Sequence, residues 1–166
     1  MLSKQATQMY PESKAIKTWK QGKLVFSIVR HTEMGHLCGY VRFPKRPVRE
    51  QHYEGILTYI PVHGGITYAQ ESKDESMVYG FDTAHCDDWS KFHPDGKKWT
   101  EEEIKAETER MAHGILLASK YEKRYLQSLT NKGKARIIDQ FHKELGIAFK
   151  VQDNFGAMIN LLAGHL

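Results

Sequence analysis

The stretch that decides the fold is residues 24–30, LVFSIVR, followed closely by residues 37–43, LCGYVRF. Both runs are rich in β-branched and aromatic side chains, which favour the extended backbone of a strand. The short polar segment between them contains Gly35, a residue that tolerates the backbone angles of a tight turn. Pro44 and Pro47 follow the second run, and proline cannot donate to a strand ladder. The pattern predicts an antiparallel β-hairpin that ends at residue 43.

Three more apolar runs extend this prediction toward a larger sheet. Residues 56–62, ILTYIPV, and residues 66–70, ITYAQ, lie on either side of a Gly-Gly pair, which indicates a second hairpin. Pro61 would place the first of these strands at a sheet edge or at a bulge. Residues 77–81, MVYGF, supply a fifth strand. We therefore expect an antiparallel sheet of about five strands.

Helix-forming residues dominate the last part of the chain. Thr100 and Glu103 have the spacing of a capping box, in which each side chain satisfies a backbone amide at the start of a helix. Asn131-Lys132-Gly133 would end this helix, and Gly114 in its middle indicates a close packing contact or a bend. Apolar or small residues recur at spacings of three and four and predict one buried face, with Glu122 left out of it: Ile104, Thr108, Met111, Ile115, Ala118, Tyr125 and Leu129.

A second helix is expected over about residues 134–145, because its apolar residues again fall on one side. Gly146 would stop this helix, since glycine is common just after a helix end. Residues 147–151, IAFKV, are expected to form a short strand, and Asp153 is expected to begin a final helix. The sequence therefore predicts a C-terminal half that is mainly helical.

Length and composition fit one globular domain. The 166 residues are 40% hydrophobic and 27% charged, which is the usual range for a chain that folds around its own core. We predict a single α+β domain over residues 1–166, β-rich from about 20 to 99 and mainly helical from 100 to 166. In this arrangement, the helices pack on one face of the antiparallel sheet.

Charge and hydropathy limit the partners. No apolar run reaches the roughly 18 residues that cross a bilayer, and the first ten residues lack the apolar stretch of a signal peptide. We therefore expect a cytoplasmic protein without a membrane partner. A net charge of +4 favours anionic partners, but no recognition motif accompanies it, so duplex DNA is not an expected partner. The sequence does not decide whether the protein forms homo-oligomers. The basic residues gather in two small groups: Lys45, Arg46 and Arg49, and further on Lys120, Lys123 and Arg124.

The first segment with suggestive chemistry is VHGGITY, residues 62–68. His63 precedes two glycines, so little side-chain bulk covers its imidazole. The backbone amides of Gly64 and Gly65 could approach an anion closely, as amides in turns do elsewhere. The alternative is a plain Gly-Gly turn with an incidental histidine. The sequence leaves both interpretations open.

The second segment is GFDTAHCDD, residues 80–88. Asp82 and His85 are three residues apart just past a predicted strand, so a helical bend would put both on one side. A carboxylate beside an imidazole can fix its tautomer and prepare it to act as a general base. The alternative is that Asp82 accepts amides from its own turn while His85 packs beside it.

Metal binding and thiol chemistry receive less support from the sequence. His63, Asp82 and His85 would be the ligands of a zinc or manganese ion, but no established ligand spacing supports this set, so no metal is expected. No cofactor is indicated. Cys86 has acidic neighbours that oppose a reactive thiolate, and Cys38 lies within a strand, where a thiol behaves as a small apolar group.

Aromatic side chains interleave with basic ones along the predicted strands. Tyr40, Tyr68 and Trp89, with Arg42 among them, have the composition of a surface that stacks a nucleobase and pairs with a phosphate. With His63, Gly64 and Gly65 they form the predicted ligand-binding set. The alternative is that strand aromatics fill ordinary cross-strand pairs.

A family resemblance rests on three motifs that occur in order: HLCGYVRFP (36–44), VHGGITY (62–68) and YGFDTAH (79–85). Together they resemble an uncharacterised family of small proteins of bacteria and their phages, with the pattern GYV-x-x-P, VHGGLTY and GFD-C-A-H. The resemblance covers about residues 36–110. Thr83 stands where that family usually has cysteine, and the histidine expected near Arg46 is missing. The resemblance implies no established activity, but it implies a phage or prophage origin and hence the host cytoplasm.

Three functions follow, in this order. The first is a phage-type accessory protein that binds a small anionic, nucleotide-like ligand, as sequestration of a host signal would require. The second is a hydrolase of a phosphoester or nucleotide, in which His85, oriented by Asp82, is the base and His63 the acid or oxyanion stabiliser. The third is a protein-binding inhibitor that uses the helical half. The first two predict that His63 and His85 lie within about 12 Å of each other at one edge of the sheet.

Overall fold

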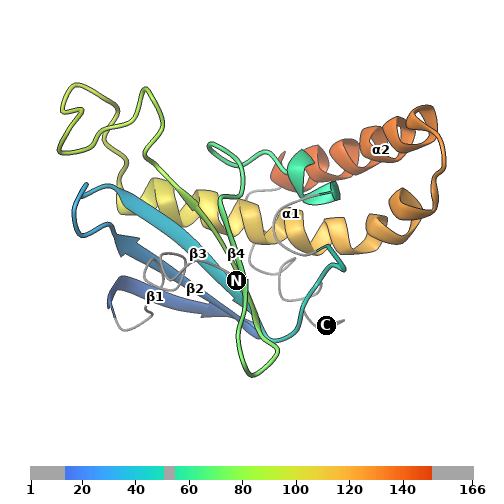
Figure 1. The fold of residues 1–166 in the computed structure, drawn as a ribbon, viewed down its shortest axis with the longest axis horizontal. Helices are drawn as coiled ribbons and strands as arrows, with labels where there is room; N and C mark the ends of the chain where they lie inside the picture. The colour runs from blue at the N-terminus through green and yellow to red at the C-terminus, as the bar shows by residue number, and fades with distance from the viewer. Residues whose placement is uncertain (1–13, 51–54, 151–166) are drawn as a thin grey trace.

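The computed structural model describes residues 14–50 and 55–150, with the side chains of those up to residue 146. Its centre is a five-stranded sheet in the order β1-β2-β3-β5-β4, in which all neighbours are antiparallel (Figure 1). Two helices follow the sheet in the chain. This confirms the predicted α+β class with a helical C-terminal half. The elements are β1 (Ala15–Gln21), β2 (Leu24–Arg30), β3 (Leu37–Phe43), η3 (Gly55–Tyr59), β4 (Tyr68–Glu71), β5 (Met77–Asp82), α1 (Glu101–Gln127) and α2 (Asn131–Lys150).

The hairpin of β2 and β3 forms as predicted, with Ser27 opposite Tyr40 in the register. The sequence does not single out β1, because its side chains alternate between half-buried and exposed and include two lysines. This strand lies at the sheet edge, where one polar row is tolerated. The Trp19 ring of β1 stacks on Phe26 of β2 at 5.2 Å between centroids, which pins the edge strand to the sheet.

The predicted second hairpin is wrong. Residues Gly55–Tyr59 form the short 3-10 helix η3, and its buried Ile56 and Leu57 pack in the main core. A short apolar run reads the same in a buried strand and in a buried helical turn, so periodicity alone does not separate them. β4 begins only at Tyr68, and its partner is β5, with Gln70 opposite Val78.

Helix α1 begins with the predicted capping box. The Glu103 amide donates to the Thr100 hydroxyl over 3.2 Å, and the Thr100 amide donates back to the Glu103 carboxylate over 2.9 Å. The helix ends at Gln127 rather than near Asn131, so Leu129 lies outside it and is 99% exposed. The predicted apolar face is otherwise confirmed in its middle, where four side chains are fully buried: Ile104, Met111, Ile115 and Ala118.

Helix α2 is longer than the sequence predicts. It begins at Asn131 and continues through Gly146 to Lys150, so the predicted stop and the short strand that would follow it are wrong. Glycine lowers helix stability by only about 1 kcal/mol, and tertiary packing outweighs that. Phe141 and Leu145 of this helix are buried in the main core. The final helix expected from Asp153 lies outside the described residues.

Helix α1 packs on one face of the sheet, as predicted (Figure 1). Val41 and Phe43 of β3 join the main core beneath the helix. The Gly114 prediction of a close contact is also confirmed, because a Cβ there would lie 2.5 Å from Ile60. Cys38 and Tyr40 point to the opposite face, since successive strand residues alternate. Within residues 14–50 and 55–150, neither helix has the length and apolar character that a membrane crossing needs.

Candidate functional site

Three segments meet at one end of the sheet, beside the early turns of α1. The first is the turn after η3, closed by the Gly65 amide donating to the Val62 carbonyl over 2.8 Å. The second is the turn after β5, in which the Asp88 amide donates to the His85 carbonyl over 2.9 Å. The third precedes α1 and is tied to the second because the Trp89 amide donates to the Lys97 carbonyl over 2.9 Å. Local turns therefore deliver side chains from three segments to one place.

Asp88 is the centre of this site. One carboxylate oxygen, Oδ2, accepts from Nε2 of His63 over 2.7 Å and from the His85 amide over 3.0 Å. The other oxygen, Oδ1, accepts from the Trp99 indole over 2.8 Å. The residue is only 4% exposed. Burial by itself would raise the pKa of Asp88, but the hydrogen bonds from His63, the His85 amide and Trp99 outweigh it and hold that pKa below its usual value.

His63 is fixed from several sides. Because the ionised Asp88 carboxylate can only accept, Nε2 of His63 carries the proton in this hydrogen bond. The His63 backbone amide donates to the Glu107 carboxylate of α1 over 2.8 Å, and its ring lies 4.6 Å from the Trp99 ring. The other ring nitrogen, Nδ1, makes no hydrogen bond to any described residue, and the side chain is 29% exposed. The imidazole is therefore oriented at one nitrogen and available at the other.

His85 stands beside His63, with 5.1 Å between ring centroids, so the predicted proximity of the two histidines is confirmed. Its ring packs against Gly64, where any Cβ would collide with it, and Gly64 has a positive φ of 67°. Nε2 of His85 is buried, has no hydrogen-bond partner in the described part of the chain, and lies 3.7 Å from a carboxylate oxygen of Asp82. Because Gly64 has no side chain, the His85 ring can pack against its backbone.

Asp82 has a different role from the one that the hydrolase hypothesis gives it. One of its oxygens accepts from the Ala84 amide over 3.0 Å, as in the Asx turn named as the alternative. The other accepts from the Thr67 hydroxyl over 2.9 Å. Both oxygens are engaged in holding the turn, and the carboxylate that orients an imidazole is Asp88, paired with His63.

The predicted ligand-binding aromatics do not join this cluster. Tyr40 is 2% exposed and meets Tyr68 edge-on at 5.4 Å between ring centroids, over Gly80 of the intervening strand β5, so the two rings pack against each other on the sheet face. Burial raises the pKa of the Tyr40 hydroxyl. Arg42 shares that sheet face, away from α1, and donates to the Ser76 hydroxyl over 3.0 Å. Trp89 follows Asp88 directly in the chain, and its ring lies against Gly35 and the Lys98 ammonium.

The turn at Gly64 and Gly65 offers an anion fewer free backbone amides than the sequence predicts. The Gly65 amide is already used within its own turn, with the Val62 carbonyl as acceptor. Both glycines have positive φ, at 67° for Gly64 and 81° for Gly65, which explains why this turn contains two of them. Their structural role is therefore to shape the turn and to admit the His85 ring.

A metal could use part of the same cluster. His63, His85 and Asp88 each offer a ligand atom, and these atoms lie within 4.8 Å of one another. Two imidazoles and a carboxylate form a donor set that zinc, manganese and iron accept. Because His63 and Asp88 already bond to each other at 2.7 Å, an ion would have to replace the proton between them. Asp82, which the sequence suggested as the third ligand, is not in this set.

Sequence reasoning missed Asp88, Trp99 and Glu107 as site residues. A signal existed only for Asp88, since a carboxylate three residues after His85 can accept an amide of its own turn. Trp99 and Glu107 reach the site through the fold, and no local pattern marks them. The thiols lie as expected: Cys86 is exposed, and Cys38 is buried, where burial and then the charge of Asp82 raise its pKa to about 12.

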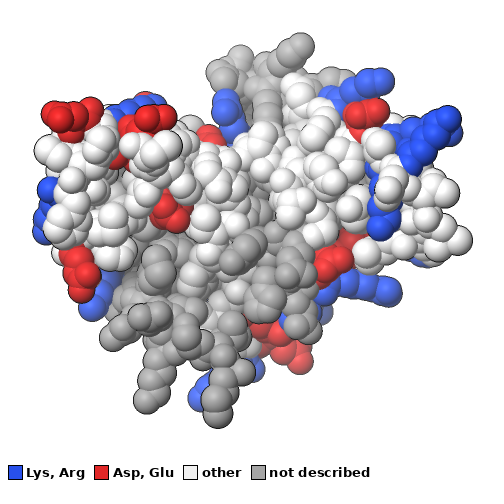
Figure 2. Space-filling view, turned by 45° about the horizontal axis from the view of Figure 1, so that its top comes forward, with Lys and Arg blue, Asp and Glu red and all other residues white. Residues whose placement is uncertain are grey.

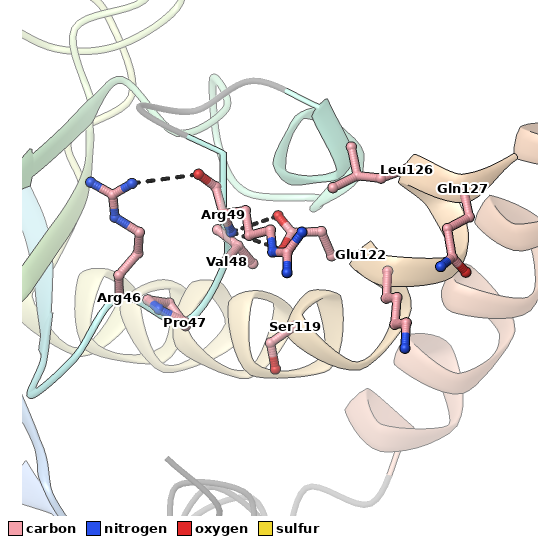
Figure 3. A pocket seen from close by; sticks show the side chains of 9 residues that line it. Arg46, Pro47, Val48, Arg49, Ser119, Glu122, Leu126 and Gln127 are labelled. Atoms are coloured by element: carbon pink, nitrogen blue, oxygen red, sulfur yellow. Dashed lines mark hydrogen bonds between the residues drawn. The ribbon is translucent and has the colours of Figure 1, made fainter. Parts of the chain in front are cut away.

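A hollow of about 670 Å³ lies at the other end of α1 (Figure 3). Arg46 and Arg49 from the loop after β3 and Lys123 from α1 line it, so the two basic groups of the sequence meet here. Arg46 is already paired with Glu71 at 2.6 Å, and the buried Glu122 accepts from the Arg49 amide at 2.8 Å. In Figure 2, Lys and Arg side chains gather at the right-hand end, where α1 passes into α2 in Figure 1.

Comparison of the chain with protein-family models, with curated proteins and with solved structures finds no match. The resemblance to an uncharacterised phage family therefore stays a prediction. Any function assigned to the chain has to come from the chemistry of the cluster itself.

Proposed function

We propose that the protein is a hydrolase of phosphoester bonds in small, nucleotide-like anions, with His63 as the general base and Asp88 as the residue that orients it. The observation that supports the proposal is the 2.7 Å hydrogen bond between Nε2 of His63 and the buried Asp88 carboxylate. A histidine held in this way keeps one tautomer and gains a partner for its cationic form, which is what a general base needs.

The proposed reaction uses both imidazoles. A water oxygen forms the new bond to phosphorus while its proton passes to Nδ1 of His63. The phosphorus–oxygen bond to the leaving group breaks, and the leaving oxygen keeps the electron pair and takes a proton from the protonated His85 ring. His63 is then a cation beside the Asp88 carboxylate, whose charge stabilises it. Solvent afterwards returns both rings to their starting states.

This assignment exchanges the roles suggested by the sequence. In the hypothesis drawn from the sequence, His85 is the base because Asp82, three residues before it, can orient its imidazole. The geometry favours His63, since both oxygens of Asp82 are engaged by its own turn and by Thr67. His85 remains close enough to serve the leaving group, at 5.1 Å between ring centroids.

Binding of the same class of ligand without turnover is the second candidate. The observation that favours it is a pair of basic side chains, Arg30 and Lys98, that line a small hollow next to the histidines. A purely binding site, however, has no need of a buried carboxylate that orients an imidazole. The hydrolase therefore accounts for more of the site.

The test compares Asp88→Asn with Asp87→Asn in the hydrolysis of bis(p-nitrophenyl) phosphate and of a panel of linear and cyclic nucleotides. Asp87 is the matched control because it is the adjacent carboxylate and is exposed. We expect Asp88→Asn to lower kcat by at least about a hundredfold and Asp87→Asn to leave it unchanged. Thermal unfolding of both variants separates loss of chemistry from loss of fold.

Two results would contradict the proposal. The first is that the wild-type protein hydrolyses no member of the panel, or that Asp88→Asn is as active as the wild type. The second is a rate that EDTA abolishes and zinc restores, which would assign the chemistry to a metal held by His63, His85 and Asp88.

A further inference from the structure

A small hollow adjoins the histidine cluster near the turn between β2 and β3. Its volume is about 10 Å³, which is about the room that one water molecule or one ligand oxygen needs. Trp99 lines the hollow and also donates to Asp88, so the hollow and the proposed acid–base pair share a wall. The other lining residues that matter for a ligand are Arg30, Gly35, His36, Trp89 and Lys98.

His36 is the first sign that this hollow takes a polar ligand. The residue is 4% exposed, and its Nδ1 is buried without a hydrogen-bond partner among the residues that the structure describes. Its ring stacks on His31 at 4.8 Å between centroids, which holds the imidazole in place but satisfies neither ring nitrogen. A buried polar atom in this condition is unfavourable until something binds to it. Burial, and next the charge of His31, lower the pKa of His36, so the ring is neutral near pH 7 and can donate from one nitrogen.

The basic residues around the hollow are the second sign. Arg30 donates to the Gly35 carbonyl over 3.1 Å, and the Lys98 ammonium lies 4.7 Å from the centre of the Trp89 ring. Lys91 packs against Gly35 as well. Within residues 14–50 and 55–146, none of these three cations is paired with a carboxylate. Lys97, by contrast, pairs with Glu103 at 3.1 Å.

We infer that the hollow is an anion subsite that holds a phosphate group of the ligand between Arg30, Lys98 and the ring of His36. In this arrangement, one phosphate oxygen accepts from the His36 imidazole inside the hollow, and the others face the guanidinium and ammonium groups at its mouth. Trp89 lies beside the phosphate, where its ring can stack on an attached base. The link of this subsite to turnover rests on the proposed hydrolase, whereas phosphate binding itself does not.

The subsite also accounts for a contrast within the dipeptide Lys97-Lys98. Both side chains lie over tryptophan rings, Lys97 over Trp99 at 4.0 Å and Lys98 over Trp89 at 4.7 Å. Within the described residues, Lys97 alone of the two pairs with a carboxylate, that of Glu103. Two adjacent lysines of similar geometry therefore differ in the charge that they can offer to a ligand, which makes them a matched pair for experiment.

The test measures binding of inorganic phosphate, AMP and adenosine by isothermal titration calorimetry. We expect phosphate and AMP to bind and adenosine to bind far more weakly. Lys98→Gln should weaken phosphate binding about tenfold, because a charge-assisted contact is lost. Lys97→Gln should change it by less than about twofold, because that charge is already paired.

A second variant, His36→Phe, removes the ring nitrogens but keeps an aromatic ring to stack on His31. It should weaken phosphate binding as well, with thermal unfolding as the check that the protein is folded. If His36→Phe does not fold, the comparison of Lys98→Gln with Lys97→Gln decides alone. Equal phosphate affinity in the wild type and Lys98→Gln, or no phosphate binding at all, overturns the subsite.

The outcomes for the subsite and for the hydrolase are distinguishable. Phosphate binding that depends on Lys98, in a protein that hydrolyses nothing, would support the subsite and end the hydrolase proposal. Hydrolysis that depends on Asp88, with phosphate affinity unaffected by Lys98→Gln, would support the hydrolase and overturn the subsite.

Discussion

The two ends of α1 each hold a buried carboxylate, and the two differ in what donates to them. Asp88 is 4% exposed and accepts from an imidazole, an indole and one backbone amide. Glu122 is 6% exposed and, among the described residues, accepts only from backbone amides, those of Arg49 and Glu50. A carboxylate that binds amides fastens a loop, whereas one that binds an imidazole also fixes the orientation and the tautomer of that ring. Burial alone therefore does not mark a functional carboxylate; its partners do.

The largest expected effect on stability comes from a substitution in the buried middle of α1, between these two carboxylates. Met111 lies in the middle of α1 and is fully buried beneath the sheet. Met111→Asp should lower the free energy of unfolding by on the order of 3 kcal/mol or more, because it buries a charge without a partner. Urea unfolding measures this, with Ala106→Asp at an exposed position of the same helix as the control. Unchanged stability in Met111→Asp would refute the packing of α1 on the sheet.

Acid should destabilise the fold through His113, which lies in α1 and is 1% exposed. Burial lowers its pKa from 6.5 to about 4, with Lys120 adding to the shift and Glu144 opposing it. The unfolded chain therefore binds more protons than the folded one between these values, so stability is lost as the pH falls from 6.5 to 4. The loss is on the order of 3 kcal/mol.

Urea unfolding at pH 7 and pH 4.5 checks this pH dependence, and it should be smaller in His113→Leu than in the wild type. His142, which is exposed on α2, provides the control as His142→Gln. The same pH dependence in His113→Leu would rule out His113 as its source. Asp88 stays ionised over this window because its pKa is lowered, so the orientation of His63 should outlast the early loss of stability.

Glu122→Gln sharpens the comparison of the two carboxylates. The amide side chain keeps one acceptor oxygen but loses the other, so we expect a loss of about 1–3 kcal/mol in the free energy of unfolding. Hydrolysis of any substrate turned over by the wild type should be unchanged at temperatures where the variant is folded. A selective loss of turnover in Glu122→Gln would mean that the two ends of α1 are coupled, and Glu122 would then do more than fasten its loop.

The smallest effect is expected from the thiols. Cys86 is exposed and takes no part in the Asp88 network, and Cys38 is a buried side chain with a raised pKa. The double variant Cys38→Ser, Cys86→Ser should keep both phosphate binding and turnover. If this variant loses all activity while His63→Ala and His85→Ala keep theirs, the site assignment is wrong.

Local sequence signals predicted the parts of this fold that local chemistry decides. The capping box at Thr100 and the buried stripe through Met111 and Ile115 are satisfied within one helix, so their spacing was enough. The run 56–62 failed because a buried 3-10 turn and a buried strand use the same apolar residues. Glu122 interrupts the stripe on α1 because it meets a loop more than 70 positions earlier in the chain, which no spacing reveals.

The site residues also fall into those that local sequence signals predict and those that only long-range contacts reveal. His63 and His85 stood out because each follows an apolar run at a turn, and turns at one sheet end come together. Asp88, by contrast, bonds to a residue 25 positions away and to an indole that reaches the site only because α1 starts beside it. The tyrosines and Arg42 were predicted from composition, which does not tell which face of the sheet a strand residue occupies until the register is known.

The central claim is that Asp88 fixes the tautomer of His63, and ¹⁵N NMR of the histidine side chains tests it without knowledge of a substrate. The wild-type protein at pH 7 to 8 should show His63 with its proton on Nε2, bonded to Asp88. Asp87→Asn should leave this signal unchanged, and Asp88→Asn should abolish it. A His63 ring that carries its proton on Nδ1, or that shows the same tautomer in Asp88→Asn as in the wild type, would contradict the account.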